Sequence, residues 1–214
     1  MSGVGSTRHM RGWWRLFPAS RIDRSTILAL AAAGLATLML TPQTYHQPFS
    51  EWDEAVAAAP LTPGILALLL GFGTTNVMAT LERGHGGRLR IARLIWSSTL
   101  AGAVAAVTLI AAPLADAQWH VPMLRNILGL TGLALLSAVV LGARQAWAPV
   151  FFPIAATLLV GRDPYTAAPR DWALLLAPAD SVIASVVAGG LLTAGIVSYT
   201  CRDSRPTHGL PEEE

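Results

Sequence analysis

The segment MATLERGHGGRLRIARLIW, residues 78–96, separates two strongly apolar stretches of the chain. It holds one glutamate, four arginines, one histidine and three glycines. Charge and glycine at this density are unfavourable in the hydrocarbon of a bilayer and favour a turn at its surface. The segment therefore predicts a membrane-surface loop, with a membrane helix on either side.

The composition of the whole chain agrees with a lipid-embedded protein. Of 214 residues, 53% are hydrophobic and only 13% are charged, and the mean hydropathy is +0.49. This length leaves room for roughly six helices of about 20 residues with short connections. No sizeable water-soluble domain fits beside them, so a nucleotide-binding module would have to come from another chain.

Six apolar segments are each near the length that crosses about 30 Å of hydrocarbon. They are residues 25–41, 61–81, 94–113, 125–143, 146–161 and 180–200. Because backbone groups in lipid must be hydrogen-bonded internally, and no alternating barrel pattern is present, these segments are expected to be helices. We predict an all-α integral membrane protein with six transmembrane helices. Its parts are a basic segment 1–24, a membrane domain 25–200 and a tail 201–214.

The distribution of arginine predicts the orientation. Placing the N-terminus in the cytoplasm puts twelve arginines inside: Arg8, Arg11, Arg15, Arg21, Arg24, Arg83, Arg88, Arg90, Arg93, Arg144, Arg202 and Arg205. Three remain outside: Arg125, Arg162 and Arg170. Since loops rich in arginine stay in the cytoplasm, both termini are expected inside, with the chain in the bacterial cytoplasmic (inner) membrane. Because the basic residues cluster beside apolar runs, lipid headgroups explain them and no nucleic-acid partner is expected.

The N-terminal segment combines basic and aromatic residues. Arg11, Trp13, Trp14 and Arg15 occur together, so rings can sit at headgroup level while guanidinium groups face phosphate. A short interfacial helix explains this pattern. The alternative is a basic tail that only orients the first span.

Two outer connections are longer than a tight hairpin. In residues 42–60, Ser50 and Asp53 resemble the capping box of a short helix that ends before Pro60. In residues 162–179, prolines flank an apolar run too short to cross, which predicts a short outer helix between spans five and six.

Catalytic and metal motifs are absent from the sequence. It contains no GxSxG, HExxH, GxxxxGK[ST] or paired CxxC motif, so no catalytic residue is predicted. One acidic loop could offer oxygen and imidazole ligands, but its spacing matches no known metal site, and we expect a solvated loop instead. Its residues are His46, Glu51, Asp53 and Glu54, with His120 from a second outer segment.

The predicted spans contain only mildly polar groups and, in their cores, no acid, histidine or arginine. Hydrogen bonding between helices explains most of these groups. The alternative is a weakly polar substrate path. Its candidate lining residues are Thr74, Thr75, Asn76 and Asn126.

The layout resembles the permease subunit of a type-two ABC exporter, in a compact form similar to those of actinobacteria. The resemblance rests on six spans, an inner N-terminus, the outer helix, and Glu82-Arg83-Gly84 followed by a basic stretch after span two. In that family this loop forms a coupling helix that docks on the ATPase. The longer threonine-leucine-glutamate continuation is replaced here by HGGRLRIAR, residues 85–93, in which we expect a basic turn leading into the third span.

The resemblance implies a passive gate driven from the cytoplasm. Two permease subunits, alike or different, would pair in the membrane above two cytosolic ATPase subunits, which bind the ATP; the chain itself would need no cofactor and would not be an enzyme. The ATPase-coupling residues implied are Glu82, Arg83, Gly84, Arg88 and Arg90. Two alternatives remain: a non-transporting membrane immunity or assembly protein, and an integral membrane enzyme of another type.

Overall fold

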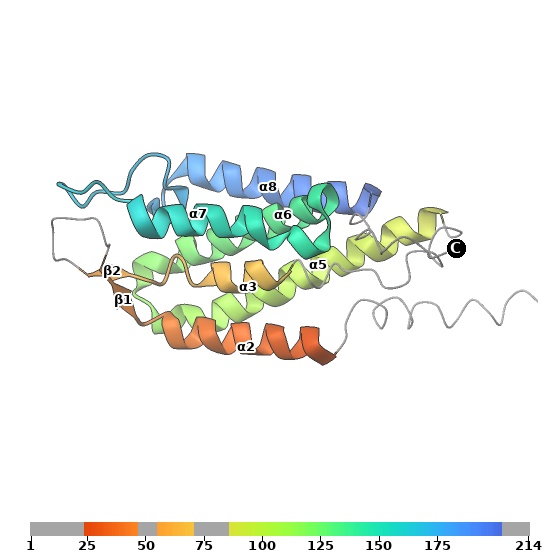
Figure 1. Cartoon of the computed structure of the whole chain (residues 1–214), viewed down its shortest axis with the longest axis horizontal. Coiled ribbons are helices and arrows are strands. Elements are labelled where there is room, and N and C mark those ends of the chain that lie inside the picture. Colours follow the sequence, from red (N-terminus) through yellow and green to blue (C-terminus); the bar gives the residue numbers. More distant parts are fainter. Residues whose placement is uncertain (1–23, 47–54, 71–85, 203–214) are drawn as a thin grey trace, which may run out of the picture.

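The computed structural model describes residues 24–46, 55–70 and 86–202. Six α-helices lie in these ranges and run side by side along the long axis of the molecule (Figure 1). They are α2 (Arg24–Leu40), α3 (Pro63–Leu70), α5 (Gly86–Ala111), α6 (His120–Leu141), α7 (Trp147–Val160) and α8 (Val182–Arg202). The prediction that the chain is mainly helical is confirmed for these ranges.

Within the described ranges, four helical segments are long and apolar enough to cross a membrane. They are Arg90–Leu114, Ala117–Leu141, Ala143–Val160 and Val182–Arg202. The apolar part of α2, Ile27–Leu40, is shorter. Of the predicted second span, residues 61–81, α3 accounts for the eight residues Pro63–Leu70.

Helix α6 is the centre of the bundle. It packs against α3, α5, α7 and α8, while α2 lies at the edge against α3 and α5. Met123, Ile127 and Leu135 of α6 are completely buried. The side chains on the outer surfaces of α5, α7 and α8 are mostly apolar and exposed, which suits contact with lipid.

Helices α6 and α8 approach each other through glycines. A methyl group on Gly132 would overlap the backbone of Leu191 and Leu192, and one on Gly195 would overlap the carbonyl of Gly132. A methyl group on Gly129 would lie 3.0 Å from the Cβ atom of Ala188, closer than ordinary van der Waals contact. Glycines therefore allow these two helices to approach closely.

The two ends of the bundle differ. One, which we call the loop end, carries residues 41–46 and 55–62, the connections 112–119 and 161–181, and a small antiparallel pair of strands, β1 (Thr44–Tyr45) and β2 (Val56–Ala57). At the other, which we call the arginine end, α5 begins and α8 ends (Figure 1).

The loop end corrects two predictions. The segment between α7 and α8 contains no α-helix, only a single 3₁₀ turn, η6 (Leu174–Leu176), so the predicted outer helix is wrong. Ala177 precedes Pro178 and has an extended backbone, which ends the turn, because a residue before proline is disfavoured in the helical conformation. In the first connection, Val56 and Ala57 form β2 where a helix was expected, while Ser50 and Asp53 lie outside the described residues.

The start of α5 corrects another prediction. Residues 88–93, expected as a basic turn before the third span, belong to the first turns of α5 itself. Gly86 and Gly87 are the first two residues of this helix. Glycine destabilises a helix less at its N-terminus than in its interior. Figure 1 shows these first turns extending past the ends of α2, α6 and α8.

Candidate functional site

A groove opens between α7 and α8 over the surface of α6. Both helices pack against α6, but they make hardly any contact with each other, although they are neighbours in sequence. The resulting cavity has a volume of about 380 Å³. That volume falls in the range of about 300–1,000 Å³ typical of small-molecule sites.

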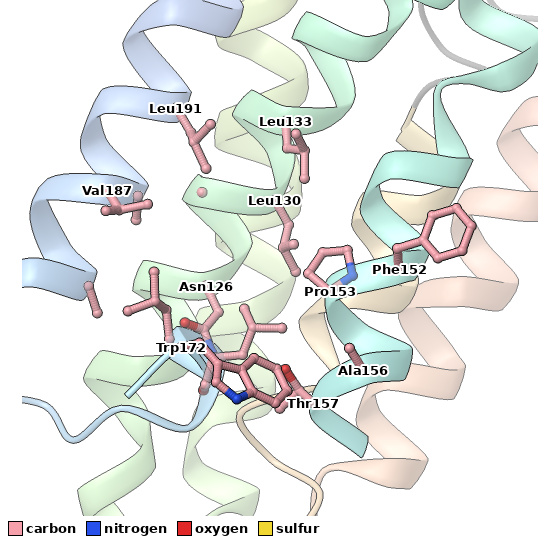
Figure 2. A pocket seen from close by; sticks show the side chains of 15 residues that line it. Asn126, Leu130, Leu133, Phe152, Pro153, Ala156, Thr157, Trp172, Val187 and Leu191 are labelled. Atoms are coloured by element: carbon pink, nitrogen blue, oxygen red, sulfur yellow. The ribbon is translucent and has the colours of Figure 1, made fainter. Parts of the chain in front are cut away.

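The groove is apolar except near the loop end. Asn126, Thr157 and Trp172 lie close together at that end, while Leu133 and Leu191 line the opposite end (Figure 2). Phe152 and Val187 stand on its α7 and α8 sides and are partly exposed at the surface of the bundle. The groove therefore changes from polar to apolar as it descends from the loop end.

Arg125 fixes the wall of this groove at the loop end. It lies in the second turn of α6 and is only 7% exposed. Its guanidinium donates to the carbonyl oxygens of Ala177 at 2.8 Å, Pro178 at 2.9 Å and Leu174 at 3.1 Å. One planar, forked side chain thus holds the whole turn that follows η6.

Asn126 extends the same network toward α3. Its side-chain amide donates to the carbonyl of Leu175 at 2.7 Å and to that of Pro60 at 2.8 Å. Its oxygen accepts a long bond from Arg125 Nε at 3.4 Å. Both amide hydrogens are therefore engaged, and Asn126 offers no free donor to a molecule in the groove.

This network corrects the sequence-based picture of the fourth span. Arg125 was expected in an outer connection, and the spans were expected to hold no arginine in their cores. Instead α6 begins five residues earlier, with Pro122 in its first turn, so Arg125 is enclosed in the helix bundle. Its four hydrogen bonds all reach uncharged oxygens, so backbone dipoles solvate the cation.

The predicted functional residues are described only in part. Asn126, expected to line a path, does border the groove. Arg88 lies on α5, and Arg90, two residues further along the same helix, is exposed at the arginine end. The others lie outside the described residues: Arg11, Trp13, Trp14, Arg15, Thr74, Thr75, Asn76, Glu82, Arg83 and Gly84.

The hydroxyl groups of the third span bond within their own helix. Ser97 donates to Leu94 O at 3.2 Å and Thr99 donates to Ile95 O at 2.8 Å. Bonding between segments is found instead at the loop end, where Thr41 and Thr62 lie 3.2 Å apart. The hydroxyl groups of Ser97 and Thr99 therefore bond to the preceding turn of their own helix rather than to another helix.

A candidate metal cluster was not expected, and within residues 24–46, 55–70 and 86–202 no three histidine, cysteine or acidic side chains come together. His46 and His120 belong to these ranges, while Glu51, Asp53 and Glu54 do not. The Nε2 atom of His120 lies 3.3 Å from the carbonyl oxygen of Ala115, and this contact fixes the turn before α6.

Sequence reasoning missed both Arg125 and the groove. The available signal was the pair Arg125-Asn126, directly followed by an apolar run. Comparison with protein-family models, with curated proteins and with solved structures gave no match.

Proposed function

We propose that the chain is the membrane-spanning permease subunit of an ATP-driven exporter, moved by a separate cytosolic ATPase. In this proposal six helices span the membrane, with the arginine end and both termini in the cytoplasm. A second permease subunit, identical or different, completes the path. The observation that carries the proposal is the length of α5 and the extension of its first turns beyond the neighbouring helices.

Helix α5 is a continuous rod that can pass movement through the bundle. It is 26 residues long, or about 39 Å at 1.5 Å per residue, which exceeds the thickness of the hydrocarbon. Its first turns extend beyond the neighbouring helices (Figure 1), and its body packs against both α6 and α8. Arg88 and Arg90 belong to these first turns. A force applied at the arginine end would therefore reach the two most closely packed helices.

The chemistry of the arginine end suits a protein partner with carboxylates. Arginine forms forked, charge-assisted hydrogen bonds, and these fix orientation as well as adding affinity. Glu82 and Arg83, four and three residues before the start of α5, are the further coupling residues in this proposal.

Co-purification tests the proposal. The chain is expressed with its neighbouring genes, and the soluble protein that accompanies it in detergent is identified and assayed for ATP hydrolysis. Replacing Glu82 and Arg83 by alanine is expected to leave membrane insertion intact and to abolish co-purification of the ATPase. The double variant Arg88→Ala with Arg90→Ala is expected to weaken it.

The matched control is Arg170→Ala, which removes an exposed arginine at the loop end. It should retain the ATPase at the wild-type level. Normal ATPase recovery and export by the Glu82 and Arg83 double variant would contradict the coupling assignment.

A further inference from the structure

The groove between α7 and α8 is suited to bind a thin, apolar molecule. We propose that it binds one acyl chain of a phospholipid from the membrane leaflet at the loop end. The inference needs only a membrane-embedded bundle and does not depend on the identity of the ATPase partner.

The first argument is the direction in which the groove opens. Phe152 is 68% exposed and Val187 is 39% exposed, and both belong to the apolar surface that would face lipid. Because α7 and α8 make hardly any contact with each other, the groove is open at the side of the bundle. In this inference that side faces the bilayer. A lipid chain can therefore enter without crossing water.

The second argument is the match between the polarity of the groove and that of a lipid. Trp172 stands at the loop end beside Asn126 and Thr157, where a headgroup and its ester region would lie (Figure 2). Tryptophan is enriched at this depth in membrane proteins. Below this rim the lining residues are apolar, and Asn126 has no free donor for a polar guest.

The third argument is length. The lining of α6 runs from Asn126 to Leu133, a rise of about 10 Å, and that of α8 covers the same distance from Ala184 to Leu191. A transmembrane helix of a second copy would cross about 30 Å of hydrocarbon and would need a groove of that length. One acyl chain that enters from the loop end and stops partway along the bundle fits a groove of about 10 Å.

Photochemical labelling tests this inference. The full chain is reconstituted in vesicles of phosphatidylethanolamine and phosphatidylglycerol that contain phosphatidylethanolamine with a diazirine on one acyl chain. After illumination, the labelled residues are identified by mass spectrometry. Labels are expected to concentrate on Leu133, Phe152 and Leu191, well above those on Val197, an exposed residue on another face of α8.

A pair of adjacent valines supplies the matched variants. Val187→Trp fills the groove and is expected to lower its labelling about fivefold, since the guest and the new ring compete for one cavity. Val186→Trp places the same ring on the open surface of α8 and should change the labelling less than about twofold. If Val187→Trp disturbs folding, Val187→Phe is the smaller replacement for the same comparison.

Two outcomes would overturn the inference. One is equal labelling of the groove and of the exposed faces, with no effect of either replacement at Val187. The other is that Val187→Cys, with Cys201→Ser, forms a disulfide-linked dimer while the groove stays unlabelled, because a second copy would then cover it. Neither outcome affects co-purification of an ATPase, so failure here is distinguishable from failure of the proposed function.

Discussion

At the scale of single residues, Arg125 connects two parts of the chain that are about fifty residues apart. Its partners are the carbonyls of residues 174, 177 and 178, none of which leaves a mark in the sequence as a partner for arginine. Side-chain type can predict a buried charge only when the opposite charge is visible. Here the compensating groups are backbone oxygens, so the sequence favoured an exposed arginine.

Replacing Arg125 by alanine is expected to destabilise the bundle by about 2–4 kcal/mol, because buried carbonyls lose their donors and a space opens beneath the loop. Arg125→Lys should be intermediate, since one ammonium cannot span three carbonyls as a forked guanidinium does. Unfolding in detergent measures both effects. Arg170→Ala, at an exposed position of the same loop end, should stay within about 0.5 kcal/mol of wild type.

Asp163 gives the loop between α7 and α8 a dependence on pH. The backbone amides of Thr166 and Tyr165 donate to its carboxylate at 2.9 and 3.0 Å and hold its pKa below the ordinary value of 3.8. Because the folded pKa is depressed, the stabilisation is present above pH 3.8 and is lost as the pH falls through the folded value.

Acidification should therefore loosen this turn first. Hydrogen exchange of the amides of Tyr165 and Thr166, corrected for its intrinsic pH dependence, is expected to accelerate as the carboxyl is protonated. Asp163→Asn should remove this acceleration, because its side chain cannot titrate. Asp180→Asn, outside the turn, should retain it, and equal profiles for the two variants would exclude Asp163 as the cause.

At the scale of elements, the sequence predicted helices well and their ends poorly. Apolar runs of spanning length placed α2, α7 and α8 within two residues of their predicted starts, because lipid allows such a run to be little else than helix. The predicted starts of α5 and α6 were eight and five residues late, since arginines were taken as outside the helices. The groove and the hydrogen-bond network of Arg125 and Asn126 depend on packing between segments that are far apart in the sequence. A local sequence pattern does not predict such packing.

The glycines of α6 and α8 provide a test of how the two elements pack. Gly132→Ala is expected to destabilise the bundle by about 1–3 kcal/mol, because its methyl group would overlap the backbone of α8. Gly190→Ala is the matched control on α8, where the new methyl group meets nothing within 4 Å. Since alanine favours helix by about 1 kcal/mol over glycine, the control should be neutral or more stable in thermal unfolding.

At the scale of the whole molecule, the two ends have different chemistry. The loop end is tied together by Arg125, Asn126 and the paired strands, whereas the arginine end presents the projecting first turns of α5. A rigid loop end and a charged opposite end suit a bundle that is moved from one side only. The proposed coupling to a cytosolic ATPase requires the arginine end to face the cytoplasm.

The single cysteine of the chain reports that orientation. Cys201 is exposed in the last turn of α8, at the arginine end. A membrane-impermeant maleimide should leave it unlabelled in intact cells and label it after lysis. With Cys201 replaced by serine, Tyr165→Cys, at a position that is 77% exposed in the loop end, should be labelled in intact cells. The opposite pattern would place the arginines of α5 outside, beyond the reach of any cytosolic ATPase, and would remove the basis of the proposed coupling.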